Sequence, residues 1–289
     1  MTDRNIREGL PKPMSMKMFL RFTNYINKDL GIKMTEAKKT MLQARLQKRL
    51  RTLGIESYDE YYDYVFSPRG LDDELPNMID VITTNKTDFF REPKHFDYLT
   101  SNVLPELARR YGTGVNRKIM FWSAGCSTGE EPYTMAMVLS DFSVRFKGFQ
   151  FGILATDIST KVLKEGMAGI YTHDKVEPVP LPMRKRYLLR SKDRKKDLVR
   201  VAPALRSAVR FQRLNFMDRE YRVGDAIDII FCRNVLIYFD RPTQEFVLNR
   251  LCRHLRPEGF LFTGHSETLN GLDVPLVPVT STVYRLAKT

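Results

Sequence analysis

The apolar residues follow a helical spacing in the first part of the chain. Between residues 14 and 84 they recur every three or four positions, which is the spacing of one buried helix face. The clearest case is the segment 34–53, with apolar residues at Met41, Leu42, Leu46, Leu50 and Leu53. Gly54 follows directly and is a typical residue for the end of a helix. The pattern predicts a small all-α N-terminal domain of four helices, residues 1–84.

A different pattern begins after residue 115, where short apolar runs alternate with helical segments. The runs are Ile119–Trp122, Phe151–Ala155, Val209–Arg213, Ala226–Cys232 and Phe260–Thr263. Such alternation is typical of a mostly parallel sheet covered by helices on both faces. We therefore expect a doubly wound α/β domain over residues 116–289, joined to the first domain by a junction and one helix, residues 85–115.

Two parts of this domain depart from the alternation. Residues from about 169 to 208 contain prolines, a lysine–arginine run and only short apolar fragments, so we expect an insert with short strands. The segment Leu276–Leu286 holds two strand-like halves with no room for a crossover helix. It predicts an antiparallel hairpin at the edge of the sheet.

Composition adds a strong positive charge to this picture. The chain has 47 Lys and Arg against 34 Asp and Glu, a net charge of +13, so an acidic partner is expected. The segment Lys33–Arg51 concentrates this charge, with seven basic residues and one acid, Glu36. The alternative interpretation of this segment is a solvated helix face that keeps the protein in solution.

Composition also predicts where the protein works. No apolar run approaches the roughly 20 residues that a membrane-spanning helix needs, and no signal peptide is recognisable. The three cysteines, Cys126, Cys232 and Cys252, lack metal-ligand spacing and cannot all pair. We expect a cytoplasmic protein without disulfides, without a bound metal and without direct membrane insertion.

The loop after the first expected strand carries the strongest chemical signal. It reads A-G-C-S-T-G-E-E from Ala124 to Glu131, and its glycines let a ligand approach the backbone at the start of a helix. A dinucleotide-binding loop would read G-x-G-x-x-G and would avoid carboxylates beside a pyrophosphate. The loop therefore predicts an amine-bearing or cationic ligand, and disfavours a nicotinamide-dependent oxidoreductase.

Polar residues follow the next three strands at the same edge of the predicted sheet, where doubly wound domains bind ligands. They are Asp157, Asn215 with Phe216, and Arg233 with Asn234. A carboxylate at the position of Asp157 commonly binds ribose hydroxyls, and Asn215 with Phe216 would suit an adenine. Two alternatives stay open: Asp157 as the N-cap of the next helix, and Arg233 as one partner of a structural ion pair.

Four longer motifs bring these residues into a known pattern. They are N-K-T-D-F-F-R-E, W-S-A-G-C-S-T-G-E-E-P-Y, F-C-R-N-V-L-I-Y-F-D and F-T-G-H-S-E. Together they closely resemble the chemotaxis receptor methyltransferase family, often called CheR, over nearly the whole chain. The resemblance implies a Rossmann-like class I methyltransferase domain with a three-stranded β-subdomain as its insert, preceded by a small helical domain. It also implies S-adenosylmethionine as methyl donor, S-adenosylhomocysteine as product, and glutamate side chains of chemoreceptors as acceptors.

The same resemblance assigns the cofactor contacts. They fall on Asn85, Thr87, Arg91, Glu131, Asp157, Asn215, Phe216, Arg233 and Asn234. Glu131 then has a chemical reason, because the donor carries an amino group and a sulfonium that a carboxylate attracts.

An acceptor carboxylate is already ionised at neutral pH, so the reaction requires no general base. Our hypothesis assigns the catalytic roles to Arg91, which orients the acceptor, and to Tyr238, whose hydroxyl lies near the transferred methyl. We expect Cys126 to be a small loop residue and His265 to pack or cap after the fifth strand.

The expected partners are the glutamate-rich cytoplasmic helices of chemoreceptors, approached by the basic segment Lys33–Arg51. In the resembling family the β-subdomain can also bind a receptor C-terminal peptide. Here the turn Ser191–Asp197 has no glycine and is highly charged, which leaves that function open.

A nucleic-acid methyltransferase is the main alternative function. Enzymes of that kind that methylate amino groups need N-P-P-Y or D-P-P-Y after the fourth strand, and this chain has R-N-V-L-I-Y there instead. A non-catalytic donor-binding module is the remaining alternative.

Overall fold

The computed structural model describes residues 13–193, 195–224 and 226–287. The chain divides into two compact units, one up to Thr84 and one from Asn85, and each is described by itself.

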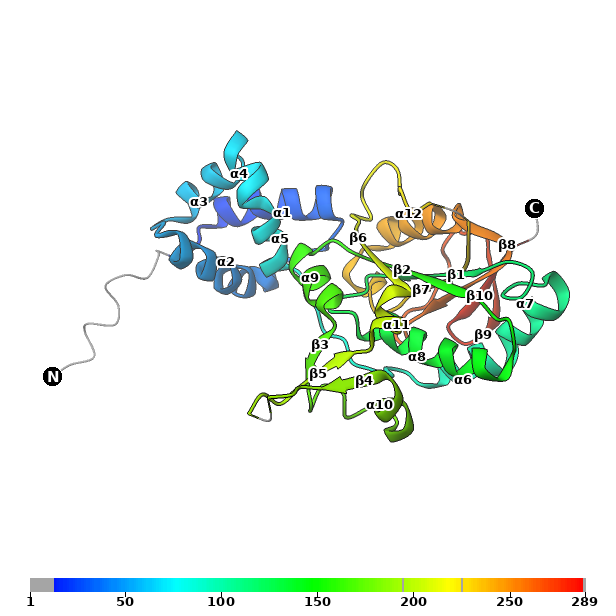
Figure 1. Ribbon diagram of the computed structural model, residues 1–289. Helices are drawn as coiled ribbons and strands as arrows, with labels where there is room; N and C mark the ends of the chain where they lie inside the picture. The colour runs from blue at the N-terminus through cyan, green and yellow to red at the C-terminus, as the bar shows by residue number, and fades with distance from the viewer. Residues whose placement is uncertain (1–12, 194, 225, 288–289) are drawn as a thin grey trace. The chain divides into compact units, whose positions relative to one another are not determined.

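Helices alone build the described part of the first unit (Figure 1). They are α1 (Met16–Leu30), the 3₁₀ turn η1 (Glu36–Lys38), α2 (Lys39–Leu53), α3 (Tyr58–Val65), α4 (Pro68–Asp73) and α5 (Leu75–Ile82). Their apolar faces bury a common core that includes Phe19, Phe22, Leu46, Leu50 and Tyr61. The unit has one α-helix more than expected, because α5 starts anew with a proline in its first turn, where the missing N–H costs nothing.

The basic segment Lys33–Arg51 is not the single helix that its pattern predicted. Lys33 precedes the η1 turn, and α2 begins only at Lys39. The side chain of Asn27 accepts the backbone N–H of Met34 at 2.9 Å, and this bond holds the chain in a loop between α1 and η1.

Two arginines of α2 have structural partners inside the unit. Arg49 donates through Nε and Nη2 to the carboxylate of Glu74 at 2.8 and 2.7 Å. Glu74 is buried and also accepts the hydroxyl of Tyr61 at 2.8 Å. Arg45 donates to the carbonyl oxygens of Ile82 and Thr83, where α5 ends. These guanidinium groups join α2 to the helices that follow it, which corrects the expectation that the whole segment presents its charge to a partner.

A mixed seven-stranded sheet forms the centre of the second unit. Its strands are β1 (Ile119–Ala124), β2 (Phe151–Asp157), β6 (Val209–Arg213), β7 (Ile227–Cys232), β8 (Leu255–Thr263), β9 (Leu276–Thr280) and β10 (Val283–Leu286). They lie in the order β6-β2-β1-β7-β8-β10-β9. The first five are parallel, and β10 is antiparallel to both β8 and β9. The expected α/β fold and the edge hairpin are thus confirmed.

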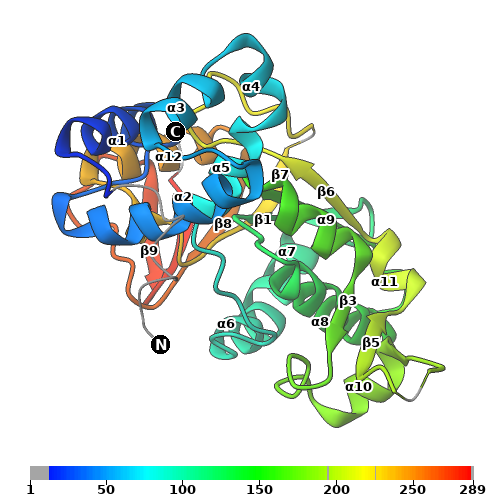
Figure 2. The ribbon, with the colours of Figure 1, turned by 90° about the vertical axis from the view of Figure 1, so that its left-hand side faces the viewer.

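The sheet changes its winding direction between β1 and β7. From β1 the chain passes through α8 (Glu130–Arg145) to β2 on one side, and from β7 it passes through α12 (Arg241–Cys252) to β8 on the other. Because both crossovers are right-handed units, α8 and α12 cover opposite faces of the sheet, as Figures 1 and 2 show. The loops after β1 and β7 therefore border the crevice in which such sheets bind ligands.

The expected insert is a small antiparallel sheet. It contains β3 (Ile170–Thr172), β4 (Leu188–Arg190) and β5 (Leu198–Val201) in the order β3-β5-β4, with α10 (Leu181–Tyr187) between β3 and β4. The helices α9 (Thr160–Ala168) and α11 (Pro203–Ser207) connect it to β2 and β6.

The junction continues into a helix that runs as α6 (Lys94–Tyr98), a π turn (Leu99–Val103) and α7 (Leu104–Tyr111). The wide π turn ends two residues before Pro105, which lacks the N–H that a regular helix would use. None of the helices among the described residues is long and apolar enough to cross a membrane.

Candidate active site

The loop between β1 and α8 is held in a conformation that favours glycine. Gly125 and Gly129 have φ values of 87° and 96°, and Ser127 between them has 49°. The N–H groups of Gly125 and Cys126 both donate to the carbonyl of Thr156 in β2, at 2.8 and 2.9 Å. A Cβ on Gly125 would lie 2.4 Å from Cγ2 of Val235. The loops after β1 and β7 thus approach so closely that only glycine fits at this position.

Asp157 ends β2 and points its carboxylate at the same loop. Oδ2 accepts the N–H of Ser127 at 2.8 Å and Oδ1 accepts the N–H of Ser159 at 3.0 Å. The N-cap of α9 is Ser159, whose hydroxyl accepts the N–H of Val162, so Asp157 is not the N-cap that was one alternative for it. These hydrogen bonds hold the carboxylate of Asp157 against the β1–α8 loop.

Arg233, directly after β7, is buried between two carboxylates. Its side chain is 1% exposed, with Nε 3.4 Å from Glu131 Oε2 and Nη2 3.5 Å from Glu92 Oε2. Nη2 also donates to the carbonyl of Arg91. This guanidinium therefore ties the junction to the β1–α8 loop, as the ion-pair alternative for Arg233 described.

The two carboxylates respond differently to this environment. Burial raises the pKa of Glu131 above its usual range, although Arg233 opposes the shift and Ser123 donates its hydroxyl at 2.7 Å. Burial would also raise the pKa of Glu92. The positive charge of Arg233 and the hydrogen bonds that Glu92 accepts are stronger, and they lower the pKa of Glu92. Glu92 is consequently the more firmly ionised of the two.

The junction reaches the site in a strained conformation. Phe90 and Glu92 have positive φ values of 54° and 56°, and the N–H of Phe90 donates to the hydroxyl of Thr134 in α8 at 3.1 Å. Arg91 lies between them, half-buried, and donates through Nη1 to the carbonyl of Lys86 at 3.0 Å. Residues at positive φ persist where the surroundings hold them and are common at functional sites.

The other predicted junction residues, Asn85 and Thr87, are half-buried in the same segment. Asn215 and Phe216 follow β6, which pairs with β2. The side-chain oxygen of Asn215 accepts the N–H of Met217 at 3.0 Å, and the ring of Phe216 packs edge-on against Phe239 with centroids 6.2 Å apart. Two further positions of the predicted set thus lie just after β6, the strand that pairs with the strand of Asp157.

Glu267 is a residue at the candidate site for which the sequence reasoning predicted no role. It is 6% exposed, and its carboxylate accepts N–H groups of Asn234 at 2.8 Å, Gly264 at 2.6 Å and Ile237 at 3.3 Å. Asn234 has a φ of 57°, and Tyr238 follows it in the short turn η3 (Leu236–Tyr238). One buried carboxylate therefore shapes the loop that carries Arg233, Asn234 and Tyr238. The only sign of Glu267 in the sequence analysis was its place as the last residue of the motif F-T-G-H-S-E.

Glu130, which had no expected role, is also structural. It is 1% exposed, accepts the hydroxyl of Thr128 at 2.6 Å and lies 3.4 Å from Nζ of Lys175 in the insert. Cys126 is buried as expected for a small loop residue, and burial raises the pKa of its thiol well above the usual range. A thiol of this kind is a poor nucleophile at neutral pH.

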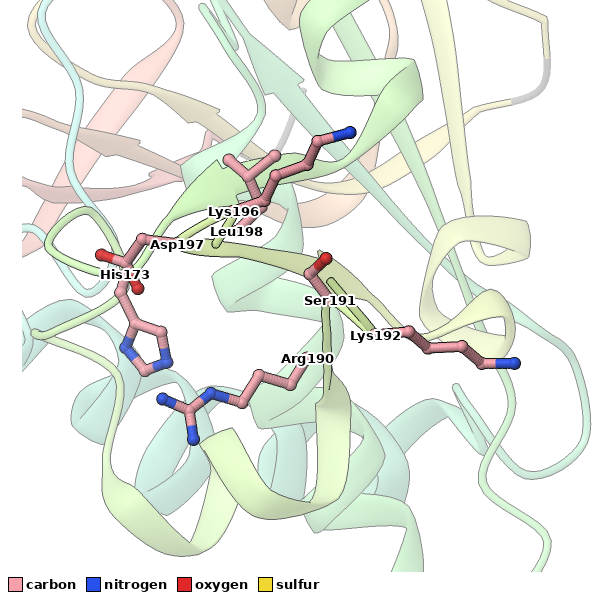
Figure 3. A pocket seen from close by; sticks show the side chains of 7 residues that line it. All are labelled: His173, Arg190, Ser191, Lys192, Lys196, Asp197 and Leu198. Atoms are coloured by element: carbon pink, nitrogen blue, oxygen red, sulfur yellow. The ribbon is translucent and has the colours of Figure 1, made fainter. Parts of the chain in front are cut away.

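The insert carries a separate basic hollow of about 760 Å³. It is lined by His173, Arg190, Ser191, Lys192, Lys196, Asp197 and Leu198. Figure 3 shows the side chains of Arg190 and His173 turned toward the same open space. This hollow includes part of the charged turn Ser191–Asp197, of which residue 194 lies outside the described residues.

Comparison with known families gives one consistent result over both units. The family model described as "CheR methyltransferase, SAM binding domain" matches residues 85–285, and "CheR methyltransferase, all-alpha domain" matches residues 17–83.

Individual relatives agree with this result. The chain is 39% identical to a chemotaxis protein methyltransferase of Borreliella burgdorferi, over 87% of this chain and 88% of the relative. It is 37% identical to chemotaxis protein methyltransferase 2 of Pseudomonas aeruginosa, over 88% and 87%. It is also 37% identical to the chemotaxis protein methyltransferase of Escherichia coli, over 93% and 91%.

Proposed function

The chain belongs to the CheR methyltransferase family and is an S-adenosylmethionine-dependent methyltransferase, and from that premise we propose that it forms methyl esters on glutamate side chains of chemoreceptors. The relatives that support the acceptor class are named chemotaxis protein methyltransferases. The observation that carries the proposal is the set of contacts at the carboxyl ends of β1, β2 and β7, where hydrogen bonds and ion pairs join the segments of Arg91, Glu131 and Asp157.

The residues around this crevice fit S-adenosylmethionine. Asp157 would accept the ribose hydroxyls, and Glu131 would face the amino group, as far as Arg233 leaves its charge available. The hydroxyl of Ser127 is buried without a hydrogen-bond partner among the described residues, so it offers a further polar contact. When bound, the donor supplies a methyl group on a positively charged sulfur.

The chain itself has to align the acceptor and keep water away from it. A glutamate carboxylate attacks in line, and most of its rate gain comes from orientation and a dry environment. In this proposal Arg91 binds the acceptor carboxylate, since its guanidinium is half-buried and fixed by the carbonyl of Lys86. Tyr238 would place its hydroxyl beside the methyl, on the loop that Glu267 shapes.

The proposal assigns the first contact with the receptor to basic side chains of the first unit. Glutamate-rich helices would be attracted by the exposed members of the basic segment, Lys33, Lys48 and Arg51. The basic hollow of the insert offers Arg190, Lys192 and Lys196 against one acid, Asp197. A receptor C-terminal peptide with acidic residues is the occupant that we propose for this hollow, and its binding would raise the local receptor concentration.

One experiment separates this function from its rivals. The purified protein is incubated with S-adenosylmethionine labelled in its methyl group, together with either receptor-bearing membranes or RNA. We expect label on receptor protein that mild base releases, because carboxyl methyl esters hydrolyse in base. Label on RNA would make the protein a nucleic-acid methyltransferase, and donor binding without any transfer would make it a binding module.

A further inference from the structure

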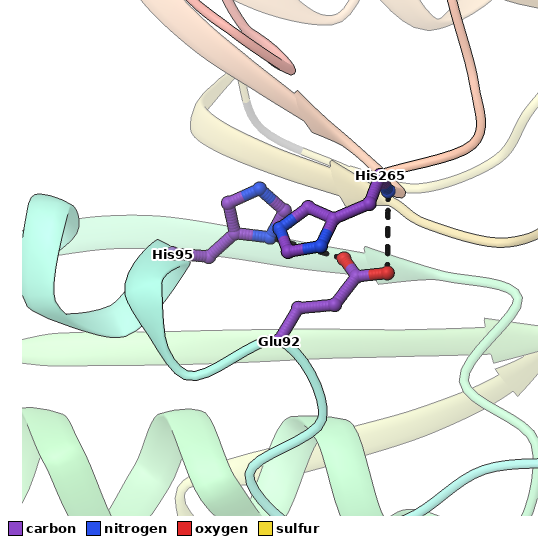
Figure 4. Close-up of side chains that lie close together, drawn as sticks. All are labelled: Glu92, His95 and His265. Carbon is purple, nitrogen blue, oxygen red and sulfur yellow. Dashed lines mark hydrogen bonds and ion pairs between the residues drawn. The ribbon is translucent and has the colours of Figure 1, made fainter.

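The fold brings two histidines and a glutamate together beside Arg233 and Asn234. They are Glu92 in the junction, His95 in α6 and His265 in the loop after β8, and one potential ligand atom of each lies within 4.8 Å of the other two (Figure 4). His265 is 173 positions from Glu92 along the chain, so the spacing of residues in the sequence gave no metal-binding pattern.

The contacts of His95 are compatible with a proton on its ring nitrogen Nε2. Its Nε2 lies 2.7 Å from the hydroxyl oxygen of Thr282. That hydroxyl also lies 2.6 Å from the carbonyl oxygen of Ser281, and when it donates its proton there it accepts from His95. Nε2 is then the N–H nitrogen, and Nδ1 of the neutral ring presents a lone pair.

This lone pair faces a carboxylate oxygen. Nδ1 of His95 lies 3.4 Å from Oε2 of Glu92, and both atoms are buried without a hydrogen-bond partner among the described residues. Oε2 has the guanidinium of Arg233 at 3.5 Å as an ion-pair partner, and a cation between Oε2 and Nδ1 would satisfy the lone pairs of both atoms. Their separation suits a metal, because two ligands of a tetrahedral ion with bonds of about 2.1 Å lie roughly 3.4 Å apart.

His265 completes a set of three. Its ring centroid lies 5.1 Å from that of His95, and its own backbone N–H donates to Glu92 Oε1 at 3.2 Å. The residue is exposed, so a small rotation of its side chain can bring a ring nitrogen to the ion. The local charge also favours a bound cation. Arg233 carries one positive charge and lies between two carboxylates, Glu92 and Glu131.

We propose that Glu92, His95 and His265 bind one divalent transition metal ion of the zinc class. Imidazole nitrogens and a carboxylate are ligands that Zn²⁺ and Co²⁺ accept, and three protein ligands leave a fourth position for water. The ion joins the junction, which carries Arg91, to the loop after β8. Since two segments far apart in sequence supply the ligands, the ion stabilises the folded second unit.

The test uses untagged full-length protein that has been treated with chelator and then titrated with Co²⁺. Binding is followed by the visible ligand-field absorption of Co²⁺ and by calorimetry. We expect one Co²⁺ per chain, binding at least about tenfold weaker in His265→Ala, and a higher Tm of the wild type in Zn²⁺. His173→Ala is the matched control, since it removes a histidine from the insert, and it should bind as the wild type does.

His265→Ala is the main variant because its side chain is exposed and its loss should leave the fold intact. Circular dichroism melting checks this, and Glu92→Gln, which keeps the shape of the side chain, gives a second measurement. If the wild type binds no Co²⁺, or if His265→Ala binds it as tightly as the wild type, the pair of acceptors shares a proton instead and the metal site does not exist.

Discussion

Arg233 is the residue whose side chain contacts both the junction and the β1–α8 loop. It lies within 3.5 Å of two carboxylates, Glu92 and Glu131, and donates to the backbone of Arg91. Breaking a buried pair of this kind typically costs about 3–5 kcal/mol, because a charge is left without its partner. Arg233 therefore contributes to the site by position, whatever contact with the donor it also makes.

Arg91 and Tyr238 are expected to act on the transferred methyl more directly. We predict that Arg91→Ala lowers kcat by about 10²-fold or more and that Tyr238→Phe lowers it by roughly tenfold. Tyr238→Phe should leave the affinity for the donor within a few-fold of the wild type, whereas Arg91→Ala should also weaken it, because Arg91 is a predicted donor contact. The measurement is steady-state methylation at saturating donor and receptor, with Arg109→Ala, an exposed arginine of α7, as control. Full turnover in both variants would show that our assignment of roles is wrong.

At the scale of elements, the loop after β7 depends on a carboxylate from the loop after β8. Glu267 accepts three backbone N–H groups, including that of Asn234 at positive φ. Such strain needs a partner that holds it. The two loops thus form one structural element, although 33 positions separate Asn234 from Glu267.

We predict that Glu267→Ala destabilises the protein by about 1–3 kcal/mol, because buried N–H groups lose their acceptor. Donor affinity and kcat should both fall, since Asn234 and Tyr238 lose their support. Glu267→Gln keeps an acceptor oxygen and should restore much of the stability but less of the activity. Urea unfolding and donor titration measure the two effects. Wild-type donor binding in the alanine variant would mean that the loop holds its shape without Glu267.

The basic segment is a second element whose charges divide into two kinds. Arg45 and Arg49 bind groups inside the first unit, so replacing them would test folding rather than recognition. We predict that Lys33→Glu, Lys48→Glu and Arg51→Glu together slow receptor methylation severalfold at low salt and flatten its salt dependence. Donor affinity should not change.

Lys147→Glu, an exposed charge reversal in the second unit, is the control for that triple variant. Initial rates over a range of NaCl concentrations give the comparison. Equal salt dependence in the triple variant and the wild type would remove the basic segment from receptor recognition.

At the scale of the whole molecule, the chain divides into two units between Thr84 and Asn85, and our proposal gives them different tasks. Every residue placed at the donor crevice belongs to residues 85–289, while the basic segment belongs to the first unit. We predict that residues 85–289 alone bind S-adenosylmethionine within about threefold of the full chain, since the first unit supplies none of these contacts. Their methylation of receptor should be much slower. Calorimetry and the labelling assay measure both, and a fragment that folds but binds no donor would contradict the prediction.

Much of the proposed site could be predicted from the sequence, because strand order places the ends of parallel strands along one edge. Glu131, Asp157, Asn215 and Arg233 each follow or border a strand whose apolar run is visible in the sequence. The junction N-K-T-D-F-F-R was identified only through its resemblance to a family. Sheet topology alone gives no reason for a segment before β1 to enter the crevice.

The sequence by itself determined the α/β fold, the insert, the edge hairpin and the family, because these depend on local periodicity and on contiguous motifs. Only the tertiary structure decided how the charged groups pair. Arg233 with Glu92 and Glu131, Glu267 with the N–H of Asn234, and Arg49 with Glu74 all join segments far apart along the chain. A partner of this kind follows from the packing of elements, so no pattern of neighbouring residues specifies it.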